Sequence, residues 1–117
     1  MNGLPETLFD ELPKLELGFR GPVIPWRGPS PYHFIEIPDA ANREIGDVAS
    51  LVTYGWGVIP VSVRIGETAW TTSLFPRMGG YLVPVKDAVR KAEGIELGDV
   101  VDVELTIEIK DWAPSDR

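Results

Sequence analysis

The sequence contains no cysteine and a single histidine, His33. Without cysteine the chain can form neither a disulfide framework nor a cysteine-ligated zinc or iron–sulfur site, and thiol catalysis is excluded. A single histidine excludes any metal site built from several histidines. It also leaves His33 as the one possible base of a Ser-His-Asp arrangement. We expect no metal and no cofactor.

Long apolar runs are also missing. The longest, around Val58–Val61, is long enough only for a strand, whereas a membrane-spanning helix needs roughly 18 apolar residues. The first seven residues have neither the basic region nor the apolar segment of a signal peptide. We therefore expect a soluble, cytoplasmic protein that has no membrane partner.

The chain is acidic, with 18 Asp and Glu against 11 Lys and Arg and a net charge of −7. The charge is unevenly distributed, because residues 51–91 carry two acids and five bases. A net negative protein repels a phosphate backbone at long range, which disfavours general nucleic-acid binding. A local basic surface built from the middle segment remains open.

The length of 117 residues suits one domain, and 44% hydrophobic with 25% charged residues is typical of a globular one. Alternation of apolar and polar residues predicts strands, and apolar residues spaced three or four apart predict helices. Strands are expected over 14–26, 32–37, 58–65, 68–75, 81–84 and 101–109. One helix is expected from Pro38-Asp39 to the 54–57 segment, and a second over 85–93.

Glycine and proline predict where these elements end. Gly66-Glu67, with glycine first, is typical of a type II′ hairpin turn, and 76–80 is expected to be a loop. Gly94 is expected to end the second helix in the left-handed conformation. Asp39 is the expected N-cap of the first helix. Gly21-Pro22 and Pro25 are expected to confine the end of the first strand to an edge or a bulge.

Strands therefore dominate, and two short helices cannot cover both faces of a sheet of this size. The predicted fold is mainly β, a small closed or partly open barrel of about six strands with two short helices. We place the barrel domain at 14–110, an N-terminal arm at 1–13 and a C-terminal tail at 111–117.

Two stretches carry a family resemblance. The first is the hairpin sequence of 56–66 and 70–76; the second, 81–101, reads Leu-Val-Pro-Val-Lys, Val-Arg-Lys-Ala, Gly-Ile and Gly-Asp before an alternating strand. Together they resemble the bacterial domain-of-unknown-function family numbered nineteen hundred and five, from about Leu15 to Ile109. The resemblance implies a double-split β-barrel akin to the AbrB and MazE type of transcription factors and antitoxins.

In AbrB-like proteins, the unit that resembles the second stretch is half of an intertwined dimer that binds DNA. This chain carries that unit once within a barrel-sized domain, so both a monomer and a homodimer are compatible with the resemblance. The family has no assigned catalytic residues, and none can be transferred to this chain.

Three residues are candidates for catalysis or cation binding. His33 shares a predicted strand face with Ile35 and Ile37. A partly buried, hydrogen-bonded histidine is favoured over a general base, since spacing places no nucleophile or carboxylate beside it. Asp102 and Glu104 lie two apart on one strand, roughly 7 Å between Cα atoms. The opposite face of that strand is apolar, which favours two solvated acids over a catalytic pair or a cation site.

Four residues are candidates for ligand binding. Tryptophan is abundant, with four in the chain, and Trp56 and Trp70 flank the predicted hairpin. They indicate either core packing or an aromatic pocket in which Arg64 or Arg77 holds a carboxylate or phosphate. The segment Arg77–Gly80 is compatible with a backbone nest for an anion, although a plain turn is favoured. The ligand-binding candidates are Arg64, Trp70, Arg77 and Arg90.

The second helix carries the nucleic-acid candidates Lys86, Arg90 and Lys91. Lys86 and Arg90 are expected to share a face, and Asp87 is expected to pair with Lys91. A soluble helix face is the simpler interpretation, and a contact with phosphate or an acidic partner is the alternative.

The sequence thus favours a non-enzymatic binding module for a small molecule or a protein partner. One alternative is an AbrB-like DNA-binding or antitoxin-type regulator, against which the net charge argues. The other is an enzyme with an unrecognised site, which rests only on His33 and scattered carboxylates. Fold alone does not decide among them, because barrels of one shape host unrelated functions.

Overall fold

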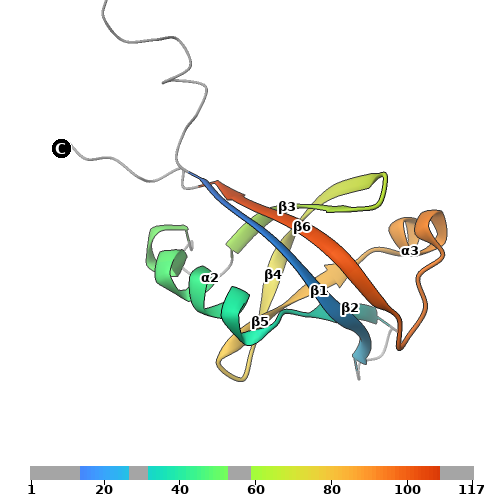
Figure 1. Ribbon diagram of the computed structural model, residues 1–117, viewed down its shortest axis with the longest axis horizontal. Helices are drawn as coiled ribbons and strands as arrows, with labels where there is room; N and C mark the ends of the chain where they lie inside the picture. Colours follow the sequence, from blue (N-terminus) through green and yellow to red (C-terminus); the bar gives the residue numbers. More distant parts are fainter. Residues whose placement is uncertain (1–13, 27–31, 53–58, 109–117) are drawn as a thin grey trace, which may run out of the picture.

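The computed structural model describes residues 14–26, 32–52 and 59–108, which form a closed barrel of six antiparallel strands and two helices (Figure 1). The strands run in the order β1-β2-β5-β4-β3-β6 around the barrel. The prediction of a mainly β barrel is confirmed. The elements are β1 (Lys14–Trp26), β2 (Tyr32–Glu36), α2 (Asp39–Val52), β3 (Ile59–Ile65), β4 (Thr68–Arg77), β5 (Gly80–Val85), α3 (Asp87–Glu93) and β6 (Val100–Glu108).

Two long strands change partner along their length, which splits the barrel wall in two places. β1 pairs with β6 as far as Pro22 and with β2 from Val23 onward. β4 pairs with β3 as far as Leu74 and with β5 from Phe75 onward. The helices pack beside these strands, α2 against β1, β3 and β5, and α3 against β4. They lie on opposite sides of the barrel (Figure 1).

The expectation that proline confines the end of β1 to an edge or a bulge is confirmed as an edge, since β1 continues through Trp26 but beyond Pro22 its described pairing is with β2 on one side. The backbone explains why. The N–H of Val23 bonds to the carbonyl of Asp99, on the β6 side. Pro25, two residues on, directs its nitrogen to that same side. The ladder with β6 ends at Pro22, so the missing N–H of Pro25 deprives no strand of a partner.

The barrel interior is filled by aliphatic side chains from alternate strand positions. In β3 the buried and exposed positions alternate strictly, and Val103, Leu105 and Ile107 of β6 are buried while Asp102 and Glu104 are exposed. A slip of one residue in β6 would bury carboxylates, so its register is firmly set. Ile95 and Val89 close the α3 end of the core, with Gly94 between them in the expected left-handed conformation.

One hairpin turn is confirmed and one predicted loop is wrong. Gly66 has a positive φ of 59° and Ile65 pairs with Thr68, as a two-residue turn with glycine first requires. The five-residue loop expected over 76–80 does not form, since β4 continues to Arg77, which pairs with Gly80. Only Met78 and Gly79 turn the chain, both with positive φ, the signature of a type I′ turn.

The first helix begins one residue earlier than an N-cap at Asp39 would give, and the second begins two residues later than predicted. The carbonyl of Pro38 accepts the first helical bond, from the N–H of Asn42, so Asp39 is the first helical residue and not the N-cap. At the second helix, Lys86 has extended backbone angles and precedes α3, and Val85 belongs to β5. Pairing of β5 with β2 is responsible, because it holds Val85 opposite His33 in the ladder.

Several predictions lie outside the described residues. These are the arm at 1–13, the turn at 27–31, the end of the first helix at 54–57 with Trp56, and the tail at 111–117. Within the described residues, no helix is long and apolar enough to cross a membrane.

Candidate functional site

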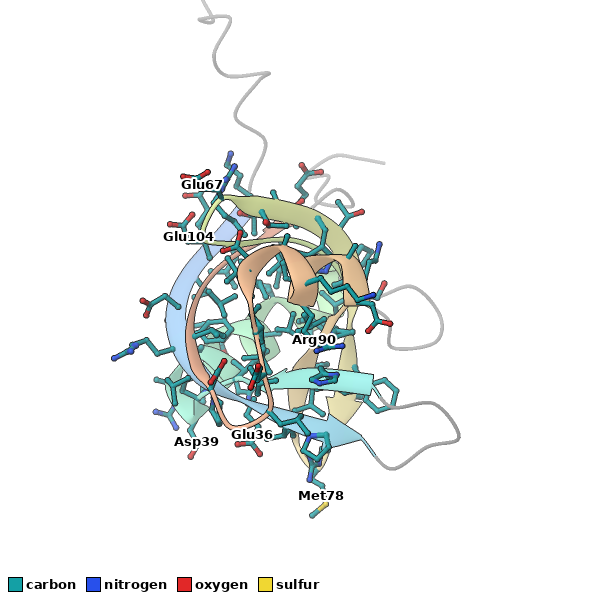
Figure 2. The ribbon with its side chains drawn as sticks, turned by 90° about the vertical axis from the view of Figure 1, so that its right-hand side faces the viewer. Glu36, Asp39, Glu67, Met78, Arg90 and Glu104 are labelled. Carbon is teal, nitrogen blue, oxygen red and sulfur yellow. The ribbon has the colours of Figure 1, made fainter. Side chains whose placement is uncertain are left out.

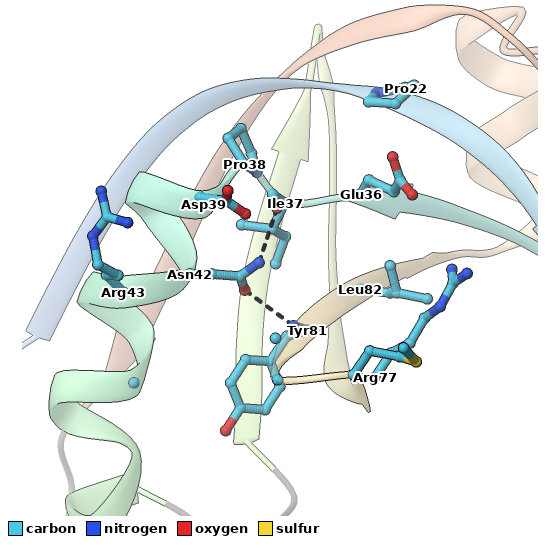
Figure 3. Close-up of a pocket in the computed structure, with 14 residues that line it drawn as sticks. Pro22, Glu36, Ile37, Pro38, Asp39, Asn42, Arg43, Arg77, Tyr81 and Leu82 are labelled. Carbon is cyan, nitrogen blue, oxygen red and sulfur yellow. Dashed lines mark hydrogen bonds between the residues drawn. The ribbon is translucent and has the colours of Figure 1, made fainter.

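A groove of about 940 Å³ runs between α2 and the hairpin of β4 and β5 (Figure 3). Its apolar floor includes Ile37 and Leu82, both buried, and Pro22 lies at its far side. The turn residues Met78 and Gly79 form one wall. The volume is in the range of ligand sites, which lie at roughly 300–1,000 Å³.

Asn42 fixes the geometry of the groove by joining α2 to two strands. Its amide nitrogen donates to the carbonyl of Ile37 at 2.9 Å, and its amide oxygen accepts from the backbone N–H of Tyr81 at 3.0 Å (Figure 3). Gly80 leaves room for this amide, because a Cβ there would lie 2.6 Å from the Asn42 nitrogen. The groove walls are thus held at a fixed separation.

Four charged side chains line the groove: Glu36, Asp39, Arg43 and Arg77. Among the described residues the recorded ion pairs are Lys14–Glu16, Arg20–Asp102 and Asp87–Arg90, so none of the four is engaged in one. In Figure 3 Arg43 rises from α2 on one side, Arg77 from β4 on the other, and Asp39 lies between them. The groove therefore offers charges of both signs to a ligand.

Two groove residues are of a type that is unfavourable for the backbone conformation at their position. Met78 has a φ of 43°, which is unfavourable for a residue with a side chain, and 94% of it is exposed. Gly46 lies in the middle of α2, where glycine costs about 1 kcal/mol relative to alanine. A Cβ at Gly46 would meet nothing within 4 Å, so packing does not demand glycine there.

The four ligand-binding candidates from the sequence do not all come together in one site. Trp70 is paired with the buried Val63, so its side chain points into the barrel, whereas Arg64 is exposed on the outer face. Only Arg77 lies in the groove. Arg90 is on α3, on the other side of the barrel. The single aromatic pocket expected from Trp70 and Arg64 is therefore not formed by these residues. The backbone nest is also not formed, since Arg77 and Gly80 are paired in the ladder.

The acids of β6 sit on the solvated face, as expected. The Oδ1 atom of Asp102 lies 2.9 Å from Nε of Arg20, and Glu104 is paired across the sheet with Arg64. A smaller hollow of about 460 Å³ on the outside of β1, β3 and β6 is lined by Asp102, Glu104, Arg20 and Arg64, among others. Within the described part of the chain, no three His, Asp or Glu side chains are close enough to hold a metal ion.

His33 is placed beside charged residues that spacing in the sequence did not reveal. It is paired with Val85, just before α3, and it points inward like Ile35. Burial lowers the pKa of His33, and the nearby Arg90 guanidinium lowers it further, while Asp87 acts in the opposite direction. The imidazole is therefore neutral at pH 7. The signal that could have found this neighbourhood is the pairing of β2 with β5, which is non-local.

A pH-dependent stability follows from this shift. The folded protein binds a proton at His33 less readily than the unfolded chain, whose histidine has the ordinary pKa of 6.5. His33 therefore favours the folded state fully above pH 6.5, and this contribution is lost as the pH falls below that value. Urea unfolding of wild type and His33→Gln should diverge below pH 6.5, with wild type losing more stability. Parallel pH profiles would contradict the assigned environment.

The nucleic-acid candidates form only a weak basic surface. Lys86 and Lys91 are exposed, but 27% of the Arg90 side chain is accessible and its Nε atom lies 3.7 Å from Oδ1 of Asp87. Asp87 therefore pairs with Arg90 and not, as expected, with Lys91. The neighbouring carboxylate and the burial of Arg90 leave two exposed lysines, which carry little sequence-independent affinity for a phosphate backbone.

A comparison with known protein families found a match over most of the chain. A family model described as "Domain of unknown function (DUF1905)" matches residues 19–105, which is most of the chain. The match includes every residue of the groove and of the α3 side of the barrel. No curated protein matches the chain.

Proposed function

The chain belongs to the DUF1905 family, and from this premise we propose that it is a non-enzymatic binding module whose groove between α2 and the β4–β5 hairpin holds a peptide segment of a partner protein. The family description assigns no activity, so the proposal rests on the surface of the molecule.

The observation that carries the proposal is the exposed Met78 at the rim of the groove. A methionine at positive φ costs of order 1 kcal/mol. Packing does not offset this cost, because 94% of Met78 is exposed to solvent. Such departures from local rules are expected at functional sites. Methionine is also the apolar side chain that adapts best to varied binding partners.

The charges of the groove support a peptide as the occupant. An extended segment carries amide dipoles and side chains of both signs, which matches two carboxylates and two guanidinium groups. A nucleic acid would be repelled by Glu36 and Asp39, and a membrane surface gives no role to four unpaired charges. The apolar floor of Ile37 and Leu82 accommodates one apolar side chain of the segment.

A random twelve-residue peptide library displayed on phage tests the proposal. We expect sequences to be enriched by wild type and by Arg64→Ala, whose side chain lies outside the groove, and to be lost with Arg77→Ala. Truncating Arg77 should weaken the selected peptides about tenfold, because an ionic hydrogen bond contributes roughly 1.5 kcal/mol. Failure of wild type to enrich any sequence, or equal enrichment by Arg77→Ala, would contradict it.

Gly46 gives a prediction in which stability and binding change in opposite directions. Gly46→Ala should stabilise the fold by about 0.5–1 kcal/mol, because alanine favours a helix more than glycine does. The new methyl group would meet no atom within 4 Å. The same methyl group narrows the groove and should weaken the selected peptides. Glu44→Ala, an exposed position of α2 outside the groove, is the control and should leave peptide affinity unchanged. Tighter or unaltered binding by Gly46→Ala would contradict the role of Gly46.

A further inference from the structure

The α3 side of the barrel holds three polar side chains that are distinct from the groove. His33 on β2 points inward beside Val85, two residues before α3 begins. Trp70 on β4 points inward beside Val63. Arg90 extends from α3 toward the barrel (Figure 2). The Arg90 guanidinium also contributes to lowering the pKa of His33, after the larger effect of burial.

Trp70 is brought to the same place by a second contact. The hydroxyl of Thr68 donates to the Oε2 atom of Glu93, which ties the start of β4 to the end of α3. Trp70 lies two residues along β4 from this anchor, and Arg90 lies one helical turn back from Glu93. Those steps are roughly 7 Å and 5 Å, and α3 packs against β4, so Trp70 and Arg90 each lie a short way from the contact between Thr68 and Glu93.

Each of the three side chains has a buried nitrogen without a hydrogen-bond partner. Among the described residues these atoms are Nδ1 of His33, Nε1 of Trp70 and Nε of Arg90. The indole nitrogen and the guanidinium nitrogen can only donate, and a neutral imidazole donates from one of its nitrogens. A buried polar atom without a hydrogen-bond partner costs about 1–3 kcal/mol, so three of them among the described residues are unusual.

We propose that His33, Trp70 and Arg90 form an oxyanion site at the α3 side of the barrel, which takes a single carboxylate or phosphate group. An oxyanion supplies acceptor atoms for the N–H groups of Trp70 and Arg90, and for His33 in the tautomer that carries its proton on Nδ1. Arg90 carries the charge that selects an anion, and the accessible quarter of its side chain gives the anion an approach from solvent. Asp87, 3.7 Å from Nε of Arg90, is the internal competitor that the anion must displace.

The site also explains why the region tolerates Arg90 beside a histidine. Burial and the guanidinium both keep the imidazole neutral. A neutral imidazole can donate to an oxyanion without adding a second positive charge next to Arg90. The proposal does not depend on the groove, which is lined by other residues of α2, β2, β4 and β5.

Nuclear magnetic resonance of His33 tests the site, because the only histidine of the chain gives one set of imidazole signals. Sodium phosphate and sodium acetate are added separately at pH 7.5, each against sodium chloride of equal ionic strength. We expect a saturable shift of the imidazole signals with phosphate, acetate or both, and the responding arm identifies the oxyanion. Shifts no larger than those with chloride would overturn the proposal.

Variants separate binding from general charge effects. Arg90→Gln should weaken the responding anion at least tenfold, and Lys91→Gln, an exposed neighbour on α3, should leave its affinity unchanged. Trp70→Phe keeps a six-membered aromatic ring and removes the five-membered ring that carries the N–H, so the variant should bind the anion several-fold more weakly. Thermal unfolding verifies that each variant is folded. The site would be overturned if Arg90→Gln and Trp70→Phe both bound the anion as tightly as wild type does.

Discussion

Gly21→Ala is expected to destabilise the protein by about 3 kcal/mol or more, because no side chain fits at the point where β1 changes partner. Gly21 is buried, and a Cβ there would run into the carbonyl oxygen of Glu36 and the side chain of Ile35. The collision is with backbone, so no rotamer change relieves it. The clash would push β1 away from β2. Glu36, one of the residues that line the groove, lies on β2.

Gly18→Ala is the matched control for this substitution. Gly18 lies on the same strand, and a Cβ there would sit 4.0 Å from the carbonyl oxygen of Val103, an ordinary contact. Its stability should change by no more than about 0.5 kcal/mol. Urea unfolding of the two variants measures the difference. Equal stability of Gly21→Ala and Gly18→Ala would show that β1 has room at the partner change.

Asn42→Ala is expected to cost about 2–3 kcal/mol, since it leaves the carbonyl of Ile37 and the N–H of Tyr81 without their side-chain partner. Each backbone group is partly buried, so water replaces the amide incompletely. The substitution also releases α2 from β5, and peptide binding in the groove should fall with stability. Asn42→Asp keeps the acceptor for Tyr81 and loses the donor, so it should be intermediate.

Arg43→Ala controls for the helix position, because Arg43 is the next residue of α2, is exposed and takes part in none of the recorded ion pairs. Its unfolding free energy should stay within about 0.5 kcal/mol of wild type. Urea unfolding of the three variants gives the order Arg43→Ala, Asn42→Asp, Asn42→Ala from most to least stable. Equal stability of Asn42→Ala and Arg43→Ala would contradict the bridging role of Asn42.

The fold was largely predictable because its signals are local. Alternation in β3 and β6 marks the inward faces, and Gly66 and Gly94 mark turns that need positive φ. The errors arose where pairing overrides local preference. Met78 occupies a turn position that ordinarily favours Asn or Gly, so the β4–β5 hairpin looked like a loop. Pro25 correctly indicated an edge, but the change of partner that creates this edge in β1 cannot be seen in the sequence.

The candidate sites were less predictable than the fold. Arg77, Trp70 and Arg90 were singled out by residue type. In the structure Arg77 lies in the groove, whereas Trp70 faces the barrel interior and Arg90 is on α3. Glu36 and Asp39 meet Arg77 only because β2 pairs with β5 and β5 returns on β4. His33 meets Arg90 through the same pairing. Sequence spacing within one element reports neither arrangement.

Photo-crosslinking in living cells at two hairpin tips tests the central claim most directly. A photoreactive amino acid replaces Met78 in one version of the chain and the exposed Glu67, at the tip of the β3–β4 hairpin, in the other. The account predicts a defined crosslinked protein from position 78 that Arg77→Ala abolishes, and no such product from position 67. Equal products from both tips, or a product at 78 that survives Arg77→Ala, would contradict a binding role for the groove.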